Sequence, residues 1–202
     1  MFKKLKFALQ RWSYRRHVKK ANHGLPTIYF DMDGVLARWR SVSVEETYRK
    51  GFFLEAPVDL LVLQLVNHLI SAGMDVRILS AAYNAQARKE KKLWLQNVGL
   101  GFIDVVFVPY GESKANYVTG KAILVDDYSQ NLREWSQAFG HVGIKYYNGV
   151  NGSHGTWRGN WLTCTMGLGD MLNLVYNVAG YLAYYNPTRD GNIVSPTEYK
   201  AR

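Results

Sequence analysis

Two carboxylates, Asp31 and Asp33, stand one residue apart at the end of an apolar run and are followed directly by Gly34. The run before them, residues 27–30, is typical of a buried strand. A carboxylate at the buried end of a strand is costly unless a cation, a metal ion or water compensates its charge. The same three residues could form a simple turn, because Asp and Gly favour turns. The pair indicates chemistry only if other reactive side chains gather beside it.

Three further polar sites follow later apolar runs. Ser80 comes after residues 74–79, Lys114 comes shortly after residues 103–108, and Asp126 and Asp127 end the run that begins at residue 122. Each has a simpler explanation when taken alone: a helix cap, a surface lysine and a turn. However, the carboxyl ends of parallel strands meet at one edge of a sheet, where ligands bind. We therefore expect all four sites to converge.

The chemistry that this set predicts is phosphoryl transfer. Four converging carboxylates repel one another unless a divalent cation joins them, and oxygen ligands without a His or Cys cluster suit Mg²⁺. One carboxylate could attack phosphorus, and a second, two residues away, could protonate the leaving oxygen and then activate water. Lys114 would balance the negative charge that builds on the phosphoryl oxygens. The expected phosphate-binding groups are Gly34, Ser80, Ala81 and Lys114.

Response-regulator receivers carry a similar set of residues on a similar sheet. In those proteins the acidic pair comes first along the chain and the lysine comes last. Here Asp31 and Asp33 come first and the Asp126–Asp127 pair comes last. The order of the residues therefore excludes a receiver.

The elements that must position these residues alternate along the chain. Five short apolar strands separated by helical segments predict an α/β fold with a doubly wound, parallel, five-stranded sheet that is covered on both faces. An apolar helix is expected over residues 162–185. The expected strands are residues 27–30, 74–79, 103–108, 122–125 and 141–146, and the helical segments are 58–71, 84–98, 113–118 and 131–139.

At these positions residues 27–147 resemble the haloacid dehalogenase (HAD) superfamily of phosphohydrolases. Residues 31–37 match the first motif of that family, Ser80 the second, Lys114 the third and the Asp126–Asp127 pair the fourth. The resemblance implies that Asp31 is the nucleophile and that Asp33 is the general acid and base. It also implies a Mg²⁺ site formed by Asp31, the backbone carbonyl of Asp33, Asp126 and Asp127, with Asp127 the closer of the last two ligands.

Within the superfamily the chain resembles small bacterial and phage 5′(3′)-deoxyribonucleotidases. That resemblance implies a 5′-nucleotidase acting through an aspartyl-phosphate, with a small helical cap over residues 38–56. Trp39, Phe52 and Phe53, together with Tyr48, would stack on the nucleobase, or else form the core of the cap. A cap of only about 20 residues leaves an open site that admits larger phosphoesters. Two alternatives therefore stay open: a nucleic-acid end phosphatase, and a nucleotide- or phosphate-binding module with vestigial catalysis.

Residues 1–24 form a basic leader. Eight of the 25 Lys and Arg residues lie within residues 1–30, which contain no acid, so the remaining 17 nearly balance the 16 acidic residues. Phe2, Leu5, Leu9 and Trp12 recur at helical spacing. The leader is predicted to be an amphipathic helix with one of three roles: packing on the body or a partner, binding an anionic membrane or nucleic acid, or organelle targeting.

The expected organisation is therefore a leader (1–24), a core (25–160) and a C-terminal helix with its tail (161–202). No stretch approaches the roughly 20 apolar residues of a membrane span. Cys164 is the single cysteine, so no disulfide forms within the chain, and a reducing cytoplasmic setting in a bacterium or phage-infected cell is expected. A homodimer stays an open alternative.

Overall fold

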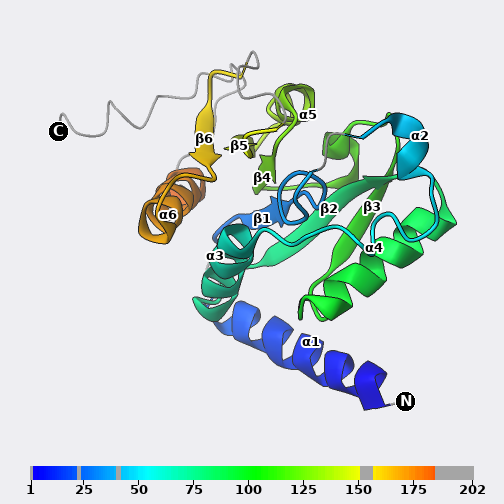
Figure 1. Cartoon of the computed structure of the whole chain (residues 1–202). Coiled ribbons are helices and arrows are strands. Elements are labelled where there is room, and N and C mark those ends of the chain that lie inside the picture. The colour runs from blue at the N-terminus through cyan, green and yellow to red at the C-terminus, as the bar shows by residue number, and fades with distance from the viewer. Residues whose placement is uncertain (1, 22–23, 40–41, 151–156, 185–202) are drawn as a thin grey trace.

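The computed structural model describes residues 2–21, 24–39, 42–150 and 157–184, and for residues 2–4 and Val44 it describes the backbone alone. Its centre is a sheet of six parallel strands in the order β3-β2-β1-β4-β5-β6 (Figure 1). Because β1 lies between β2 and β4, the chain winds outward in both directions from β1. The strands are β1 (Thr27–Phe30), β2 (Val76–Ala82), β3 (Val105–Pro109), β4 (Ala122–Asp126), β5 (His141–Tyr147) and β6 (Asn160–Thr163).

The strands are apolar without a break because helices cover both faces of the sheet. In β1, Ile28 and Phe30 enter one core cluster, and Tyr29 enters the cluster on the other face. The first face is covered by α3 (Leu60–Ser71), α4 (Ala85–Asn97) and α6 (Leu168–Tyr184), and the second by α5 (Ser129–Trp135) and the 3₁₀ helix η1 (Lys114–Tyr117). Local signals fix the helix starts, since the side chains of Asp59 and Asn84 accept backbone N–H bonds at the first turns of α3 and α4.

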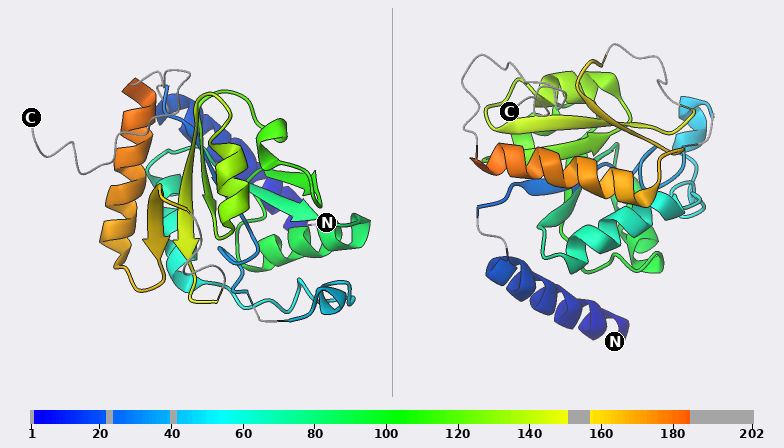
Figure 2. Two further views of the ribbon diagram at one scale, coloured as in Figure 1. Left: turned by 90° about the horizontal axis from the view of Figure 1, so that it is seen from above. Right: turned by 90° about the vertical axis from the view of Figure 1, so that its left-hand side faces the viewer.

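The predicted α/β class and the parallel sheet covered on both faces are confirmed, but the number of strands was wrong. Asn160–Thr163 forms β6 beside β5, with Ile144 opposite Asn160, where the sequence predicted the start of a helix. A four-residue strand shows only two inward positions, which periodicity cannot detect. The C-terminal helix begins later, at Leu168, and lies beside β6 at that edge of the sheet (Figure 2).

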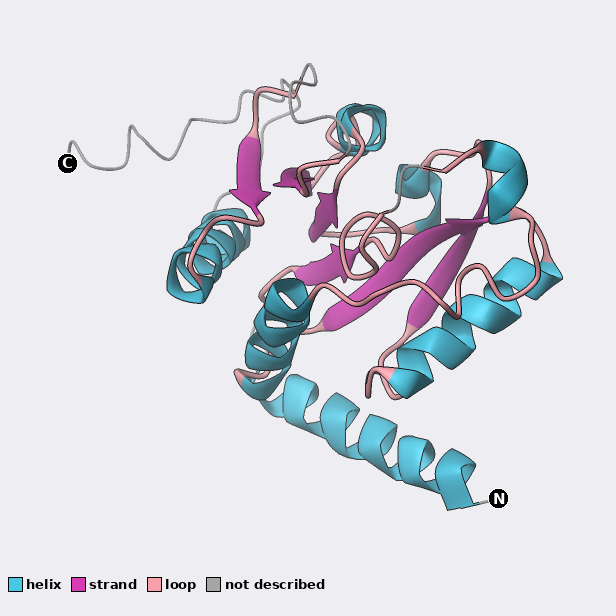
Figure 3. Ribbon diagram, viewed as in Figure 1, coloured by secondary structure: helices cyan, strands magenta, loops and turns pink. Residues whose placement is uncertain are grey.

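The segment between β1 and α3 is less helical than a helical cap implies. Of its described residues, only Val44–Thr47 form a helix, α2, and residues 50–55 form successive turns. Pairing of residues 36–38 with 57–59 closes the segment at its base, through hydrogen bonds from Arg38 N to Pro57 O and from Asp59 N to Leu36 O (2.8 Å each). The cap therefore stands over the end toward which β1, β2 and β3 point (Figure 3).

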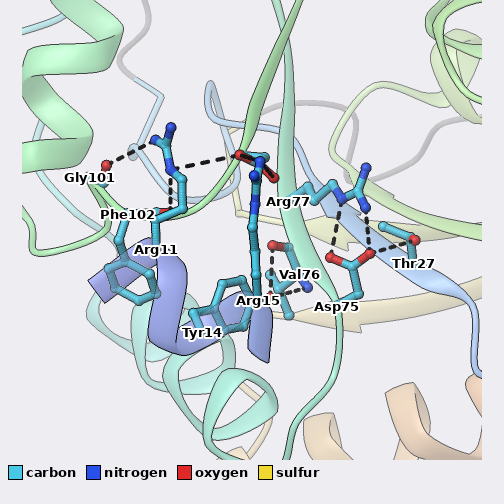
Figure 4. Close-up of polar contacts among 10 residues, drawn as sticks. Arg11, Tyr14, Arg15, Thr27, Asp75, Val76, Arg77, Gly101 and Phe102 are labelled. Atoms are coloured by element: carbon cyan, nitrogen blue, oxygen red, sulfur yellow. Dashed lines mark hydrogen bonds and ion pairs between the residues drawn. The ribbon is translucent and has the colours of Figure 1, made fainter. Parts of the chain in front are cut away.

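The basic leader forms helix α1 (Phe2–Ala21), which lies at the amino ends of the strands, away from the cap (Figures 1 and 4). The buried Tyr14 hydroxyl accepts a hydrogen bond from Val76 N (2.6 Å) at the start of β2 and lies 3.0 Å from Met74 O. The guanidinium of Arg15 binds both carboxylate oxygens of Asp104, just before β3 (2.8 and 2.9 Å). Helix α1 is thus fixed at the amino ends of the strands. None of the helices that the structure describes is both long and apolar enough to cross a bilayer.

Candidate active site

Three carboxylates meet where β1 and β4 end. Asp31 follows β1, and its backbone N–H donates to the carbonyl of Val125 in β4 (2.9 Å), so the parallel pairing places Asp31 next to Asp126 and Asp127. Ligand oxygens of these three acids lie within 4.8 Å of one another. All three residues are buried, which makes their mutual repulsion strong and calls for cationic compensation.

Lys114 supplies part of that compensation. Its ammonium lies 2.6 Å from Asp126 Oδ2 and 3.0 Å from Asp31 Oδ2, and its side chain is 3% exposed. Burial alone would lower the pKa of Lys114, but the charges of Asp126 and Asp31 outweigh that effect and raise its pKa above the ordinary value. Lys114 therefore stays charged and bridges the ends of β1 and β4.

Asp126 and Asp127 differ in their surroundings. Both oxygens of Asp126 are hydrogen-bonded to protein donors: Oδ1 accepts from Tyr128 N (2.8 Å), and Oδ2 accepts from Asn131 Nδ2 (2.9 Å) as well as from Lys114. Burial raises the pKa of Asp126, and Lys114 opposes that rise. Asp126 is thus committed to holding the lysine, an arrangement that leaves Asp127 as the acid of the pair that is better placed to bind a metal ion.

Gly34 allows the close approach of Asp127. Its φ is +77°, a conformation that residues with a side chain rarely adopt, and a Cβ atom there would lie 2.1 Å from Asp127 Oδ2. Asn148, just after β5, donates from its side-chain amide to Gly34 O (2.8 Å) and to Asp127 Oδ2 (3.0 Å). The loop after β1 and the acidic pair after β4 are therefore held together by Asn148, which the sequence analysis did not single out.

Asp33 faces a second lysine that sequence reasoning missed. The ammonium of Lys91 forms a short ion pair with Asp33 and also donates to Ser80 Oγ (3.0 Å) and Ala81 O (2.6 Å). Burial is the main cause that raises the pKa of Asp33, and Lys91 works against it. The signal in the sequence was the place of Lys91 on α4, among the buried positions Ala87 and Trp94, where an amphipathic helix normally carries apolar residues.

The neighbouring residue on α4 anchors the cap. The buried carboxylate of Glu90 accepts the backbone N–H groups of Gly51 (2.7 Å) and Phe53 (3.3 Å) and is also bonded by Gln86 Nε2 (2.7 Å). Glu90 and Lys91 thus connect one turn of α4 both to the cap loop and to Asp33. A displacement of this turn would move the cap and the acid together.

Two of the aromatic residues expected to stack on a nucleobase are packed within the cap. Phe52 and Phe53 are each 4% exposed and pack edge to face at 5.1 Å, so they form the small core of the cap. Trp39 is half-buried. The packing of both rings fits the alternative that they form the core of the cap, and base stacking by these residues stays a prediction. Phe53 also borders the site, because its ring centre lies 4.6 Å from Lys91 Nζ.

Three tyrosine rings form a row beside the cap. Tyr48 was among the rings expected to stack on the base, whereas Tyr83 and Tyr110 were not singled out from the sequence. The ring of Tyr83, which follows β2, lies 4.8 Å from that of Tyr48 in the cap and 4.7 Å from that of Tyr110, which follows β3. Tyr48 and Tyr110 are 57% and 64% exposed. The charge of Asp33 is among the causes that raise the pKa of Tyr83, after burial, so this row of rings begins close to the carboxylates.

A third buried lysine, Lys145, lies behind the acidic pair. It is opposite Asp126 in the β4–β5 register and donates to Ser129 Oγ (2.6 Å). Burial lowers the pKa of Lys145, and the charges of Asp127 and Asp126 oppose that shift. A lysine inside an otherwise apolar strand was the sequence signal for it. The four carboxylates of the site are therefore surrounded by three buried ammonium groups.

The donor set fits a hard divalent cation. Asp31 and Asp127 offer carboxylate oxygens at the mouth of the site, and the group that could hold a metal ion contains neither His nor Cys. Mg²⁺ prefers such all-oxygen surroundings and keeps part of its water shell for substrate. Within the described residues the carboxylate of Asp33 is not part of this group, and the expected contribution of its backbone carbonyl stays a prediction.

Comparisons with known proteins establish the fold. No family model and no curated protein matches the sequence. A structure from Mesorhizobium loti that is named as a HAD-like phosphatase superimposes with a TM-score of 0.50 at 16% identity, over 77% of this chain and 88% of that one. The fold is HAD-like. A chain of the Pnkp1/Rnl/Hen1 complex superimposes with a TM-score of 0.51 at 17% identity, over 61% of this chain. This match spans about half (47%) of that chain's length.

Proposed function

We propose that the protein is a phosphomonoesterase that works through an aspartyl-phosphate. The observation that carries the proposal is the bridge of Lys114 between Asp31 and Asp126, with Asp127 beside them, at the carboxyl edge of a HAD-like sheet. This arrangement offers a nucleophilic carboxylate, a fixed positive charge and a place for a divalent cation within a few ångströms of one another. The similarity to a structure named as a HAD-like phosphatase supports the same conclusion.

The residues divide the reaction into two steps. A carboxylate oxygen of Asp31 attacks phosphorus, and Asp33 gives its proton to the departing alkoxide, so the P–O bond to the substrate breaks as the bond to Asp31 forms. Asp33, now ionised, then takes a proton from water, which attacks the aspartyl-phosphate and releases inorganic phosphate. Burial suits Asp33 to this cycle, because it raises the pKa of the carboxyl group and so favours the protonated form that the first step needs.

A bound Mg²⁺ would neutralise the phosphoryl oxygens and the clustered acids. Asp31 and Asp127 would hold it with the Asp33 carbonyl, and Asp126 would keep Lys114 in place. Ser80 contributes its hydroxyl at the bottom of the site, where Lys91 orients it (3.0 Å). The backbone N–H groups near Gly34 and Ala81 would bind the remaining phosphoryl oxygens.

For the substrate we propose a 5′-nucleotide. The support is the row formed by Tyr48, Tyr83 and Tyr110, together with the adjacent groove of about 270 Å³ between the cap and the start of α4. Exposed aromatic rings beside a phosphate site are suited to stacking on a base. The nucleic-acid end phosphatase is less well supported, because the basic helix α1 that motivated it lies at the amino ends of the strands.

The test is release of inorganic phosphate by the full chain, with and without Mg²⁺, from nucleoside 5′-monophosphates, deoxynucleoside 3′- and 5′-monophosphates, sugar phosphates and 5′-phosphorylated oligonucleotides. We expect Mg²⁺-dependent turnover with the highest kcat/KM on mononucleotides. Asp31→Asn should abolish turnover but retain nucleotide binding, measured by calorimetry. Asn97→Asp, at the exposed end of α4, is the matched control and should leave turnover unchanged.

Three outcomes would decide against parts of this proposal. Nucleotide binding without any turnover in the unmodified chain would identify a binding module with vestigial catalysis. Preference for phosphorylated oligonucleotides over mononucleotides would favour the end phosphatase. Full activity in Asp31→Asn would exclude the aspartyl-phosphate.

A further inference from the structure

Helix α1 does not contact the body through the apolar stripe that its sequence predicts. The docked positions are Phe7, Arg11, Tyr14 and Val18, which recur at helical spacing. The ring of Phe7 lies against Gly101, where an added Cβ would be 2.9 Å from it. The Arg11 guanidinium donates to Phe102 O (3.0 Å; Figure 4). This side of the helix is therefore occupied by the body.

The apolar stripe of the leader lies on the other side. Leu5, Leu9 and Trp12 are 60%, 60% and 62% exposed, the values expected for side chains that the body does not cover. At about 100° per residue, these three fall within a sector of roughly 60° that faces away from Tyr14. The helix thus presents three large apolar side chains in a row, and these side chains lie outside the buried core.

Basic side chains lie beside this stripe, and residues 1–30 of the sequence contain no acidic residue. Arg16 continues the stripe by one turn, with its guanidinium 5.5 Å from the ring centre of Trp12. Lys6, Lys19 and Lys20 are exposed along the same helix, and the first acidic residue of the chain is Asp31. Long cationic side chains beside an apolar stripe can place their charges at headgroup level as the stripe enters the acyl boundary.

We propose that the exposed face of α1, defined by Leu5, Leu9, Trp12 and Arg16, binds the surface of an anionic phospholipid bilayer. Charge complementarity selects this occupant. A second copy of the chain would bring the same acid-free basic face against itself, which is repulsive. A nucleic acid would meet apolar side chains at the centre of the face, where cations are needed for phosphate. A bilayer with anionic headgroups satisfies both the apolar centre and the basic borders.

The position of α1 makes such binding compatible with a working site. Helix α1 contacts the starts of β2 and β3, whereas the carboxylates follow β1 and β4 at the carboxyl ends of the parallel strands. The seven residues of β2 span about 20 Å. A membrane held against α1 would therefore leave the carboxylate edge open to water and to substrate.

The test is co-sedimentation of the full chain with vesicles of phosphatidylcholine containing 30% phosphatidylserine, and with vesicles of phosphatidylcholine alone, at about 0.1 M salt. We expect at least tenfold stronger binding to the anionic vesicles. The variant L5S/L9S/W12S should bind at least tenfold more weakly than the unmodified chain. The matched control L60S/F139S/Y184S removes three other exposed apolar side chains and should bind normally.

A second measurement separates insertion from simple adsorption. Brominated acyl chains should quench part of the tryptophan fluorescence of the bound chain. Trp12→Phe should bind as well as the unmodified chain and lose that quenching.

Several results would overturn the proposal. These are equal binding to both kinds of vesicle, unchanged binding by L5S/L9S/W12S, or an unchanged quenching signal in Trp12→Phe. Two other results would also overturn it, in each case if the chain does not bind vesicles at all. One is that the chain binds a single-stranded oligonucleotide and L5S/L9S/W12S does not. The other is that the chain self-associates and L5S/L9S/W12S does not. Phosphatase assays of all variants on a small soluble substrate report whether the body is intact, independently of membrane binding.

Discussion

Lys114 Nζ lies 2.6 Å from Asp126 Oδ2 and 3.0 Å from Asp31 Oδ2, so a single buried ammonium joins the ends of two neighbouring strands. Replacing it by methionine would leave two buried carboxylates without their cation. We expect Lys114→Met to lose about 3–5 kcal/mol of unfolding free energy, measured by urea denaturation, and at least about 100-fold in kcat. Lys89→Met, at an exposed position on α4, is the control. Normal stability in Lys114→Met would contradict the bridging role.

Lys91 forms an ion pair with Asp33, the acid of the proposed reaction, and should therefore tune its pKa. Burial raises the pKa of Asp33, and the nearby ammonium lowers it. Lys91→Met removes the opposing cation, so the pKa of Asp33 should rise further. The acid form then persists to higher pH and the base form also appears at higher pH. The alkaline limb of the kcat/KM profile, measured from pH 5 to 9, should therefore move toward higher pH, because kcat/KM reports the step in which Asp33 acts as an acid. An unmoved profile would show that Lys91 only packs.

Gly34 is needed both for its positive φ and for the close approach of Asp127, and one matched control can separate these two requirements. Gly99 has a similar φ, +87°, but nothing lies within 4 Å of an added Cβ. We expect Gly99→Ala to lose about 1 kcal/mol from backbone strain alone. Gly34→Ala should lose about 1–3 kcal/mol more, because its Cβ would overlap Asp127, and its activity should fall with Asp127 displaced. Equal losses in chemical denaturation would mean that Asp127 moves aside without cost.

The tyrosine row should distinguish substrates that carry a base from those that do not. Tyr48→Ala and Tyr110→Ala each remove one exposed ring. A stacked ring contributes about 1–3 kcal/mol per base, so KM for a nucleoside monophosphate should rise at least fivefold. KM for ribose 5-phosphate should stay the same. Tyr184→Ala, which removes a ring from the exposed end of α6, serves as the control. A parallel rise for both substrates would assign the rings a purely structural role.

His141 couples folding to pH at a place remote from the site. It is 6% exposed, stacks on Trp135 at 4.1 Å, and burial lowers its pKa below the ordinary value. The neutral ring is thus favoured in the folded chain, whereas below about pH 6.5 the unfolded chain takes up a proton more readily. Its contribution to stability is present above that pH and declines as pH falls. His141→Phe should therefore lose less stability than the unmodified chain between pH 7 and 5. Equal declines in the urea midpoint would exclude this coupling.

Several features follow from the sequence alone. Unbroken apolar runs can be satisfied only when both faces of a sheet are buried, and this determined the parallel α/β fold. Asp31, Lys114 and Asp126 each stand at or shortly after the end of an apolar run. Parallel pairing brings the carboxyl ends of all such strands to one side of the sheet, so these residues meet. These inferences depend on local patterns combined with one geometric rule, so they needed no coordinates.

Other features were decided only by tertiary packing. Lys91 and Glu90 looked like ordinary charges of a surface helix until α4 was placed against Asp33 and the cap loop. Periodicity identified a stripe on α1, but it cannot tell which side of a helix meets the body. The hydrogen bonds of Tyr14 to β2 fixed that choice and left Leu9 and its neighbours exposed. Contacts between residues far apart in the chain depend on how the elements pack, and a pattern within one element does not contain that information.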